Sequence, residues 1–194
     1  MAKAKDSKSG KSSASGRSEE KPIDAVTARE AFQRLDELLK KTLTLYMGGG
    51  TSMVMAHGYP LATSDVDALP KQASFEEIDD LVKQVARELT LPADWLNPYF
   101  SSFTHVLPPD FASRVVRVFD GKFLKVDALG REDMLIMKCF AHRPKDLGHA
   151  RALLKLGVQM NIVDAAIEAC QERGVPGVEK AIEFLDDLLE EQED

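Results

Sequence analysis

The sequence predicts an α+β fold in which a small mixed β-sheet with helices is followed by a helical C-terminal part. Short apolar segments of strand-like composition occur only before Gly130, and helical segments separate them. Every segment after Gly130 has helical periodicity. Strands mixed with helices, followed by helices alone, are typical of this class. Hydrophobic residues make up 44% of the 194 residues, so the chain can bury a core without disulfide bonds.

The first elements are expected to be a helix, a strand and a second helix. Over residues 24–41 apolar side chains recur at helical spacing, and Thr27 with Glu30 has the spacing of a capping box. Residues 43–47 are apolar and partly β-branched and run into three glycines, which predicts a buried strand entering a tight turn. Residues 51–57 form a short apolar segment that ends at a glycine, as helices often do.

The middle of the chain predicts a second strand, a helix and a hairpin. Residues 62–69 alternate in polarity, and a helix with one apolar face opens at Ser74. The proline-rich segment 91–109 is expected to be irregular. An Asp-Gly pair between two strand-like runs predicts a hairpin over 114–129. Three aromatic residues of the irregular segment are expected to anchor the core: Trp95, Tyr99 and Phe100.

The remaining chain predicts four helices, over residues 131–142, 145–156, 161–173 and 178–191. We therefore expect three regions: a disordered basic tail over 1–22, an α/β core over 23–130 and a helical part over 131–194 packed on the core. The tail lacks Leu, Ile, Val and aromatic residues, so it cannot offset the entropy cost of folding.

Charge and composition exclude several classes of protein. The tail holds six basic and three acidic residues, so the rest of the chain carries a formal charge of −10. An acidic body argues against broad binding to duplex nucleic acid, although the tail itself could contact RNA. Two cysteines provide neither a disulfide framework nor a four-cysteine zinc site. With no apolar run near the ~18 residues that span a bilayer and no secretory signal, we expect a cytoplasmic protein without membrane contact.

The strongest chemical signal is the glycine turn at 48–52 followed by Asp65 and Asp67. On the expected strand the two carboxylates share a face, roughly 6–7 Å apart, and no cation between them neutralises their charge. Mg²⁺, or Mn²⁺ in its place, would relieve that repulsion. The turn before a helix offers free backbone N–H groups to a phosphate. Together these features predict phosphoryl or nucleotidyl transfer, whereas each alone is more often a tight turn or a solvated strand edge.

Asp127 is the expected third carboxylate of this site. It lies in a strand-like run with Lys125 on the same face, and would be a metal ligand or the general base. An equally weighted alternative is that both side chains face water.

Lys138 is surrounded by apolar residues for two turns, so its ammonium must meet an anion or extend to the surface. A nucleoside triphosphate would supply that anion. Asp146 either caps the next helix, or it orients Lys138 or contacts the nucleotide. Arg143 and Lys145 would add phosphate contacts.

Several motifs together resemble the minimal nucleotidyltransferase-like proteins, which include the AbiE-type abortive-infection toxins and related bacterial families. The motifs span Tyr46–Ser52, His57–Pro60, Thr63–Asp67, Glu132–Lys138 and Arg143–Asp146. The resemblance implies a polymerase-beta-like core over 23–130, a nucleoside triphosphate substrate and Mg²⁺ held by Asp65 and Asp67. It implies that Gly49, Gly50 and Ser52 bind the triphosphate and that Lys138 contacts the nucleotide. With Thr51 of the same turn, and with Arg143 and Lys145, these are the expected nucleotide-binding residues. The resemblance also matches Lys138 and Asp146 to a nucleotide-contacting lysine and a catalytic aspartate.

Members of this group transfer a nucleotide to an RNA or protein hydroxyl, and several are toxins neutralised by an antitoxin. We therefore expect a Mg²⁺-dependent nucleotidyltransferase acting on an RNA such as tRNA, or on a protein, with a cognate antitoxin as partner. In this hypothesis Asp127 or Asp146 activates the acceptor hydroxyl. Two departures favour an alternative, a catalytically silent binding or regulatory protein: Leu61 replaces a frequent arginine, and His149 a frequent acid.

Overall fold

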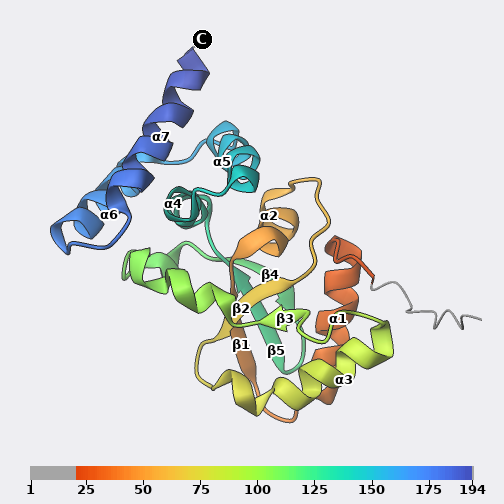
Figure 1. The fold of residues 1–194 in the computed structure, drawn as a ribbon. Coiled ribbons are helices and arrows are strands. Elements are labelled where there is room, and N and C mark those ends of the chain that lie inside the picture. Colours follow the sequence, from red (N-terminus) through yellow and green to blue (C-terminus); the bar gives the residue numbers. More distant parts are fainter. Residues whose placement is uncertain (1–20, 194) are drawn as a thin grey trace, which may run out of the picture.

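A computed structural model describes residues 21–193 (Figure 1). The expected tail over 1–22 lies outside these residues, except for Lys21 and Pro22. The elements are α1 (Ala25–Leu38), β1 (Leu43–Met47), α2 (Gly49–His57), β2 (Val66–Pro70), η1 (Phe75–Glu77), α3 (Asp79–Leu89), β3 (Leu96–Asn97), η2 (Tyr99–Val106), η3 (Phe111–Ser113), β4 (Val116–Asp120), β5 (Leu124–Ala128), α4 (Arg131–Ala141), α5 (Pro144–Lys155), α6 (Met160–Glu172) and α7 (Val178–Glu193). Here α denotes an α-helix, η a 3₁₀ helix and β a strand.

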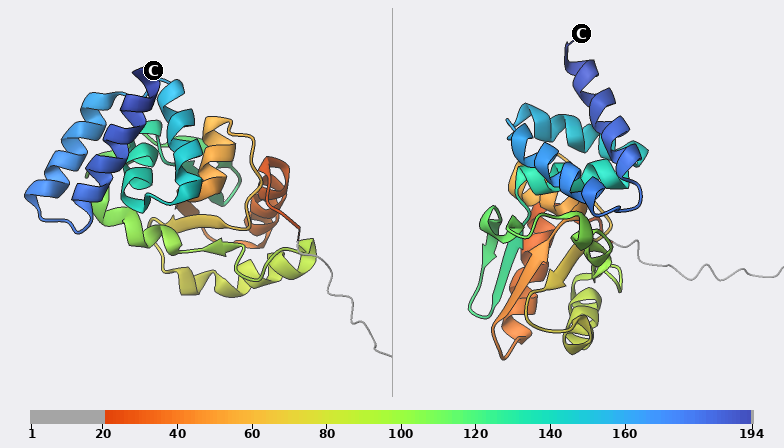
Figure 2. Two further views of the ribbon diagram at one scale, coloured as in Figure 1. Left: turned by 45° about the horizontal axis from the view of Figure 1, so that its top comes forward. Right: turned by 90° about the vertical axis from the view of Figure 1, so that its left-hand side faces the viewer.

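A mixed five-stranded sheet forms the centre of the molecule, with the strand order β3-β2-β1-β5-β4. The central strand β1 pairs antiparallel with β2 and parallel with β5, and β4 and β5 form the predicted hairpin. Helices α1 and α3 lie on one side of this core, and α4–α7 gather on the other side (Figures 1 and 2). The predicted α+β class, a small mixed sheet followed by a helical part, is confirmed.

Two clusters of buried side chains hold these layers together. In the first, alternate residues of β1 pack against α1 and α3, and Trp95 is fully buried with its Nε1 donating to the carbonyl oxygen of Val82 at 3.0 Å. The second lies among α4–α7 but also includes Met53 of α2 and Phe100 of η2. Because both parts of the chain contribute to the second cluster, the division at residue 130 stays a prediction.

Local details differ from the sequence-based expectations where tertiary contacts decide the boundary. Asp24, not Thr27, caps α1, because its side chain accepts from the Thr27 N–H at 2.8 Å. Strand β2 begins only at Val66, since the preceding residues are held by a single bridge from Thr63 to Ile23. Tyr99 is 59% exposed, so it does not anchor the core as Trp95 does. No helix within the described residues is long and apolar enough to cross a bilayer.

The Asp36 carboxylate of α1 fixes the turn of the β4–β5 hairpin. It accepts hydrogen bonds from the backbone N–H groups of Lys122, Phe123 and Leu124 at 3.0, 2.6 and 2.5 Å. Asp36 is only 6% exposed. A Cβ atom at Gly121 would lie 2.5 Å from this carboxylate, so the glycine of the Asp-Gly pair permits the contact. Burial alone would raise the pKa of Asp36, but the three donors outweigh burial and lower it.

We expect Asp36→Ala to lower the free energy of unfolding by about 3 kcal/mol, because three backbone N–H donors, one of them buried, lose their acceptor. Urea denaturation monitored by circular dichroism would measure this loss, with the exposed Asp186→Ala as control. Because folding lowers the pKa of Asp36, the deficit should be complete above pH 5 and shrink as the pH falls below the ordinary value of 3.8. A deficit independent of pH would contradict this role.

Candidate active site

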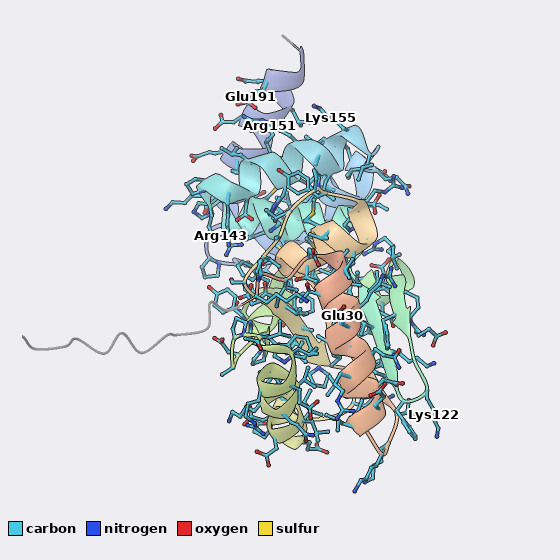
Figure 3. The ribbon with its side chains drawn as sticks, turned by 90° about the vertical axis from the view of Figure 1, so that its right-hand side faces the viewer. Glu30, Lys122, Arg143, Arg151, Lys155 and Glu191 are labelled. Atoms are coloured by element: carbon cyan, nitrogen blue, oxygen red, sulfur yellow. The ribbon has the colours of Figure 1, made fainter. Side chains whose placement is uncertain are left out.

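A cavity of about 560 Å³ lies at the junction of the α/β core and the C-terminal helices. The core contributes the start of α2 and the segment that leads into β2, and the helical part contributes α4 and α5. Arg143, at the beginning of α5, lies on the side of the helical part that faces the core (Figure 3). The polar and glycine residues that matter below are Gly50, Asp65, Asp67, Lys138, Arg143, Lys145 and His149.

The glycine turn brings the backbone of α2 against the Asp67 carboxylate. The Gly48 N–H donates to the carbonyl oxygen of Asp67 at 2.9 Å. Gly49 has a φ of +66°, and a Cβ atom there would overlap the Asp67 carboxylate, so two independent constraints require glycine. No side chain caps the start of α2. Its first N–H groups therefore have the positive end of the helix dipole available for an anion.

Asp65 is held by hydrogen bonds from three directions. Its backbone carbonyl accepts from the Thr51 hydroxyl at 2.7 Å, and its carboxylate accepts from Thr63 and Asn97, both at 3.3 Å. Asp65 precedes β2 instead of lying within it, so the two carboxylates do not alternate along one regular strand as expected. They nevertheless line the same cavity, because the glycine turn and the Thr51 contact draw both segments together.

The charged form of Asp67 is disfavoured in this setting. Burial raises the pKa of the Asp67 carboxyl, and the negative charge of Asp65 raises it further. The cations Arg143, Lys138 and Lys145 offset only part of this effect. An additional cation beside Asp65 and Asp67 would remove the remaining electrostatic cost.

The hydroxyls of the glycine turn have other positions than the resemblance implies. Thr51 is 1% exposed and donates to Asp65, so its role is to position that loop. Ser52 is fully buried, and its Oγ has no hydrogen-bond partner among the described residues. Neither side chain lines the cavity, so the expected nucleotide contacts of this turn can come only from the backbone of Gly49, Gly50 and their neighbours.

Lys138 and Asp146 form a buried ion pair at the floor of the cavity. The Lys138 Nζ lies 2.7 Å from the Asp146 Oδ1, and the two residues are 3% and 0% exposed. Arg143 adds a second ion pair at 2.7 Å, and Asp146 also accepts from the Arg143 N–H in a capping box that begins α5. Burial lowers the pKa of Lys138, while for Asp146 burial is outweighed by His149, Arg143 and Lys138, which lower its pKa.

Asp146 therefore both caps α5 and pairs with Lys138, so two roles that the sequence analysis set against each other occur together. Its lowered pKa and complete burial do not suit the other expected role, activation of an acceptor hydroxyl. Arg143 and Lys145 do line the cavity, as expected of phosphate-binding cations.

Asp127 does not reach the cavity. Its carboxylate accepts two hydrogen bonds from the guanidinium group of Arg117 on β4, and the bond to the Asp127 Oδ2 measures 3.3 Å. Strand β1 separates Asp127 on β5 from Asp67 on β2, which places them roughly 10 Å apart across the sheet. Contrary to expectation, the structure thus keeps Asp127 from serving as third metal ligand or general base, because a neighbouring arginine neutralises it.

The donor set for a metal ion is therefore limited to Asp65 and Asp67. Among residues 21–193 no three His, Cys, Asp or Glu side chains are grouped to share a metal ion. Two carboxylates suffice for Mg²⁺ where the other ligands are water and phosphate oxygens. The residues present fit such an ion, since Asp67 and Asp65 repel each other without one.

Three further residues of the site were not predicted to belong to it. Asn97 holds the Asp65 carboxylate, and the exposed Tyr99 stands at the cavity two residues later. Their segment was expected to be irregular, and Tyr99 was expected only as a core anchor. Tyr59 lines the cavity with its ring edge-on to His149, and it belongs to one of the motifs that carried the resemblance.

Comparison with known families agrees with this geometry. A family model described as nucleotidyltransferase of unknown function (DUF6036) matches residues 27–173, most of the chain. The matched range includes every cavity residue named above. No curated protein and no solved structure matches the chain.

We expect Asp67→Asn to stabilise the protein at pH 7, by up to about 1 kcal/mol, because a neutral group of equal size ends the repulsion with Asp65. Since folding raises the pKa of Asp67, the gain should shrink as the pH falls through that raised pKa and vanish below the ordinary value of 3.8. Asp146→Asn should have the opposite effect, a loss of about 3 kcal/mol, because it leaves Lys138 buried beside a neutral group. Chemical denaturation of both variants would test the contrast, and equal destabilisation would refute it.

Proposed function

The chain belongs to the family of nucleotidyltransferases of unknown function (DUF6036), and we propose from this premise that it transfers a nucleotidyl group from a nucleoside triphosphate to a hydroxyl group. The observation that carries the proposal is one cavity lined by two repelling carboxylates, the start of α2 and three cations. A triphosphate with a divalent cation complements this distribution of charge.

The residues of the core would hold the metal ion and the phosphates. Asp65 and Asp67 would bind Mg²⁺, or Mn²⁺ in its place, which when bound neutralises charge on the phosphates of the leaving pyrophosphate. The backbone N–H groups at Gly49 and Gly50 would donate to phosphate oxygens at the positive end of α2. Glycine is required at position 49 because a side chain there would displace Asp67.

The residues of the helical part would neutralise the rest of the triphosphate. Lys138 is oriented by Asp146, while Arg143 and Lys145 line the same cavity. Leu61, at the position where relatives often carry arginine, also lines it. We infer that Arg143 and Lys145 supply the positive charge that this position lacks.

The acceptor is proposed from the family resemblance and not from the cavity. An RNA such as tRNA, or a protein, would present the hydroxyl, and a toxin–antitoxin or phage-defence pair would be the setting. The acidic body of the chain disfavours extended contact with RNA, so an RNA acceptor would be bound at its end, near the cations of the cavity.

A second candidate function is a catalytically silent protein that acts by binding a partner. The observation in its favour is that Asp127 is paired with Arg117, which leaves two carboxylates where three were expected. Such a protein would keep the fold and the ion pair between Lys138 and Asp146 without transferring a nucleotide.

Incubation with each labelled nucleoside triphosphate, Mg²⁺, total RNA and a protein extract would test the leading proposal. We expect incorporation of label that chelation of the metal abolishes and that Asp67→Asn reduces by about 100-fold or more. Asp186→Asn, which changes an exposed carboxylate of α7, is the matched control. Unchanged incorporation by the folded Asp67→Asn protein would eliminate the proposed site.

Titration calorimetry separates the two functions. An active enzyme should bind at least one of the four nucleoside triphosphates when Mg²⁺ is present, and Lys138→Met should weaken that binding by about tenfold, because one phosphate contact is lost. Absence of binding to all four at millimolar concentration would favour the silent protein.

A further inference from the structure

The cavity contains no uncommitted carboxylate that could take the proton of an acceptor hydroxyl. Arg117 neutralises Asp127, and Asp146 carries ion pairs to Lys138 and Arg143. Asp65 and Asp67 are the two carboxylates assigned to the metal ion. His149 is a further lining residue, and histidine is the side chain that most often serves as general acid or base.

His149 is held in one orientation from two sides. It lies on α5 one turn after Asp146 and is only 5% exposed. Its Nδ1 lies 3.8 Å from the Asp146 Oδ1, on the same side of α5. The Tyr59 ring meets the imidazole edge-on, with the ring centres 4.9 Å apart at 86°. Gly148 permits this approach, because a Cβ atom there would lie 2.9 Å from the Tyr59 hydroxyl.

The position of Asp146 selects one tautomer of the neutral ring. Nδ1 is completely buried and has no hydrogen-bond partner in the described part of the chain. If Nδ1 carried a lone pair, it would face the negative Asp146 carboxylate; if it carries the proton, the interaction is attractive. The Nε2 atom then keeps the lone pair. Nε2 is not among the buried unpartnered atoms and no hydrogen bond engages it within residues 21–193, so it is the ring nitrogen open to the cavity.

We propose that His149 is the general base of the transfer reaction and that Asp146 is its positioning residue; this inference rests on the function proposed above. The acceptor O–H gives its proton to Nε2 of His149 while the acceptor oxygen forms a bond to the α-phosphorus. The bond from the α-phosphorus to the bridging oxygen breaks, and pyrophosphate leaves with that electron pair. His149 then releases its proton to water.

The charged surroundings of His149 suit this role. Asp146 stabilises the imidazolium that forms, as the buried aspartate of a catalytic triad does. The cations that neutralise Asp146 would also bind the triphosphate. The negative charge of the bound triphosphate would then offset their positive charge near the His149 imidazole. The titratable and charged groups around the ring are Asp146 and Lys145 of α5, Arg143 at its start, Lys138 of α4, Tyr59 of the loop after α2, and Asp65 and Asp67 across the cavity.

Single-turnover transfer of labelled nucleotide across a range of pH would test the catalytic part. We expect the wild-type rate to fall at acidic pH, and His149→Gln to lower the rate by about 100-fold and remove this acidic limb, with nucleotide affinity changed less than about threefold. Added imidazole should restore part of the rate of His149→Ala. His105→Gln, which alters an exposed histidine of η2, is the matched control.

A second measurement does not depend on activity. The chain has four histidines, and comparison with His149→Gln assigns the imidazole ¹⁵N resonances of His149. We expect the neutral ring to carry its proton on Nδ1, with Nε2 unprotonated.

The outcomes separate this inference from the proposed function. A wild-type protein that transfers no nucleotide under any condition overturns both. An active wild type with an unimpaired His149→Gln variant overturns the role of His149 alone. So does a neutral ring protonated on Nε2, or a variant that loses nucleotide affinity but keeps the acidic limb, because His149 would then be a phosphate contact only.

Discussion

Burying a carboxylate completely costs free energy of folding unless cations pair with it. The arrangement of much of this site therefore depends on the ion pairs of the buried Asp146. Lys138 reaches it from α4 and Arg143 from the start of α5. The two helices are thereby fixed to one another at the point where they meet the α/β core. The same contacts leave the cations beside the cavity, so the side chains of this ion-pair network are also those proposed to bind phosphate.

The core contributes the opposite charge at a cost to its own stability. Gly49 lets the Asp67 carboxylate approach the first turn of α2, and Thr51 draws the Asp65 loop to the same place. The resulting pair of carboxylates is repulsive, and the pKa of Asp67 rises because of burial and Asp65. Two other buried carboxylates have partners that stabilise their charge. Asp36 accepts backbone N–H groups, and Asp146 forms an ion pair with Lys138. Arg143, Lys138 and Lys145 offset only part of the cost at Asp67, and a bound cation would offset the rest, which supports the metal site proposed above.

The sequence predicted the elements better than the partners of individual side chains. The strand over 43–47, the Asp-Gly hairpin and four C-terminal helices could be located because hydrophobic periodicity and glycine positions are local signals. The convergence of Asp65, Asp67 and Lys138 on one cavity was also foreseeable from motif spacing. The loss of Asp127 to Arg117 was not, because it depends on the register of β4 against β5. Nor were the contact of Asn97 with the Asp65 carboxylate and the place of Tyr99 at the cavity, because both depend on the path of an irregular segment.

The role of His149, where the chain departs from the family pattern, can be interpreted only with the side chains that surround it in the structure. In the sequence it replaces a frequent acid and favours loss of activity. In the structure it stands at the cavity with a buried Nδ1 near Asp146, while the carboxylate expected to act as base is held elsewhere. Among the described residues that line the cavity, Asp65 and Asp67 are the carboxylates, and His149 supplies an imidazole. In an enzyme that has lost its activity, we expect catalytic side chains to be lost independently of one another. Here, among those lining residues, an imidazole is present in the cavity and a third carboxylate is not. This is the pattern expected if a different residue has taken over proton transfer.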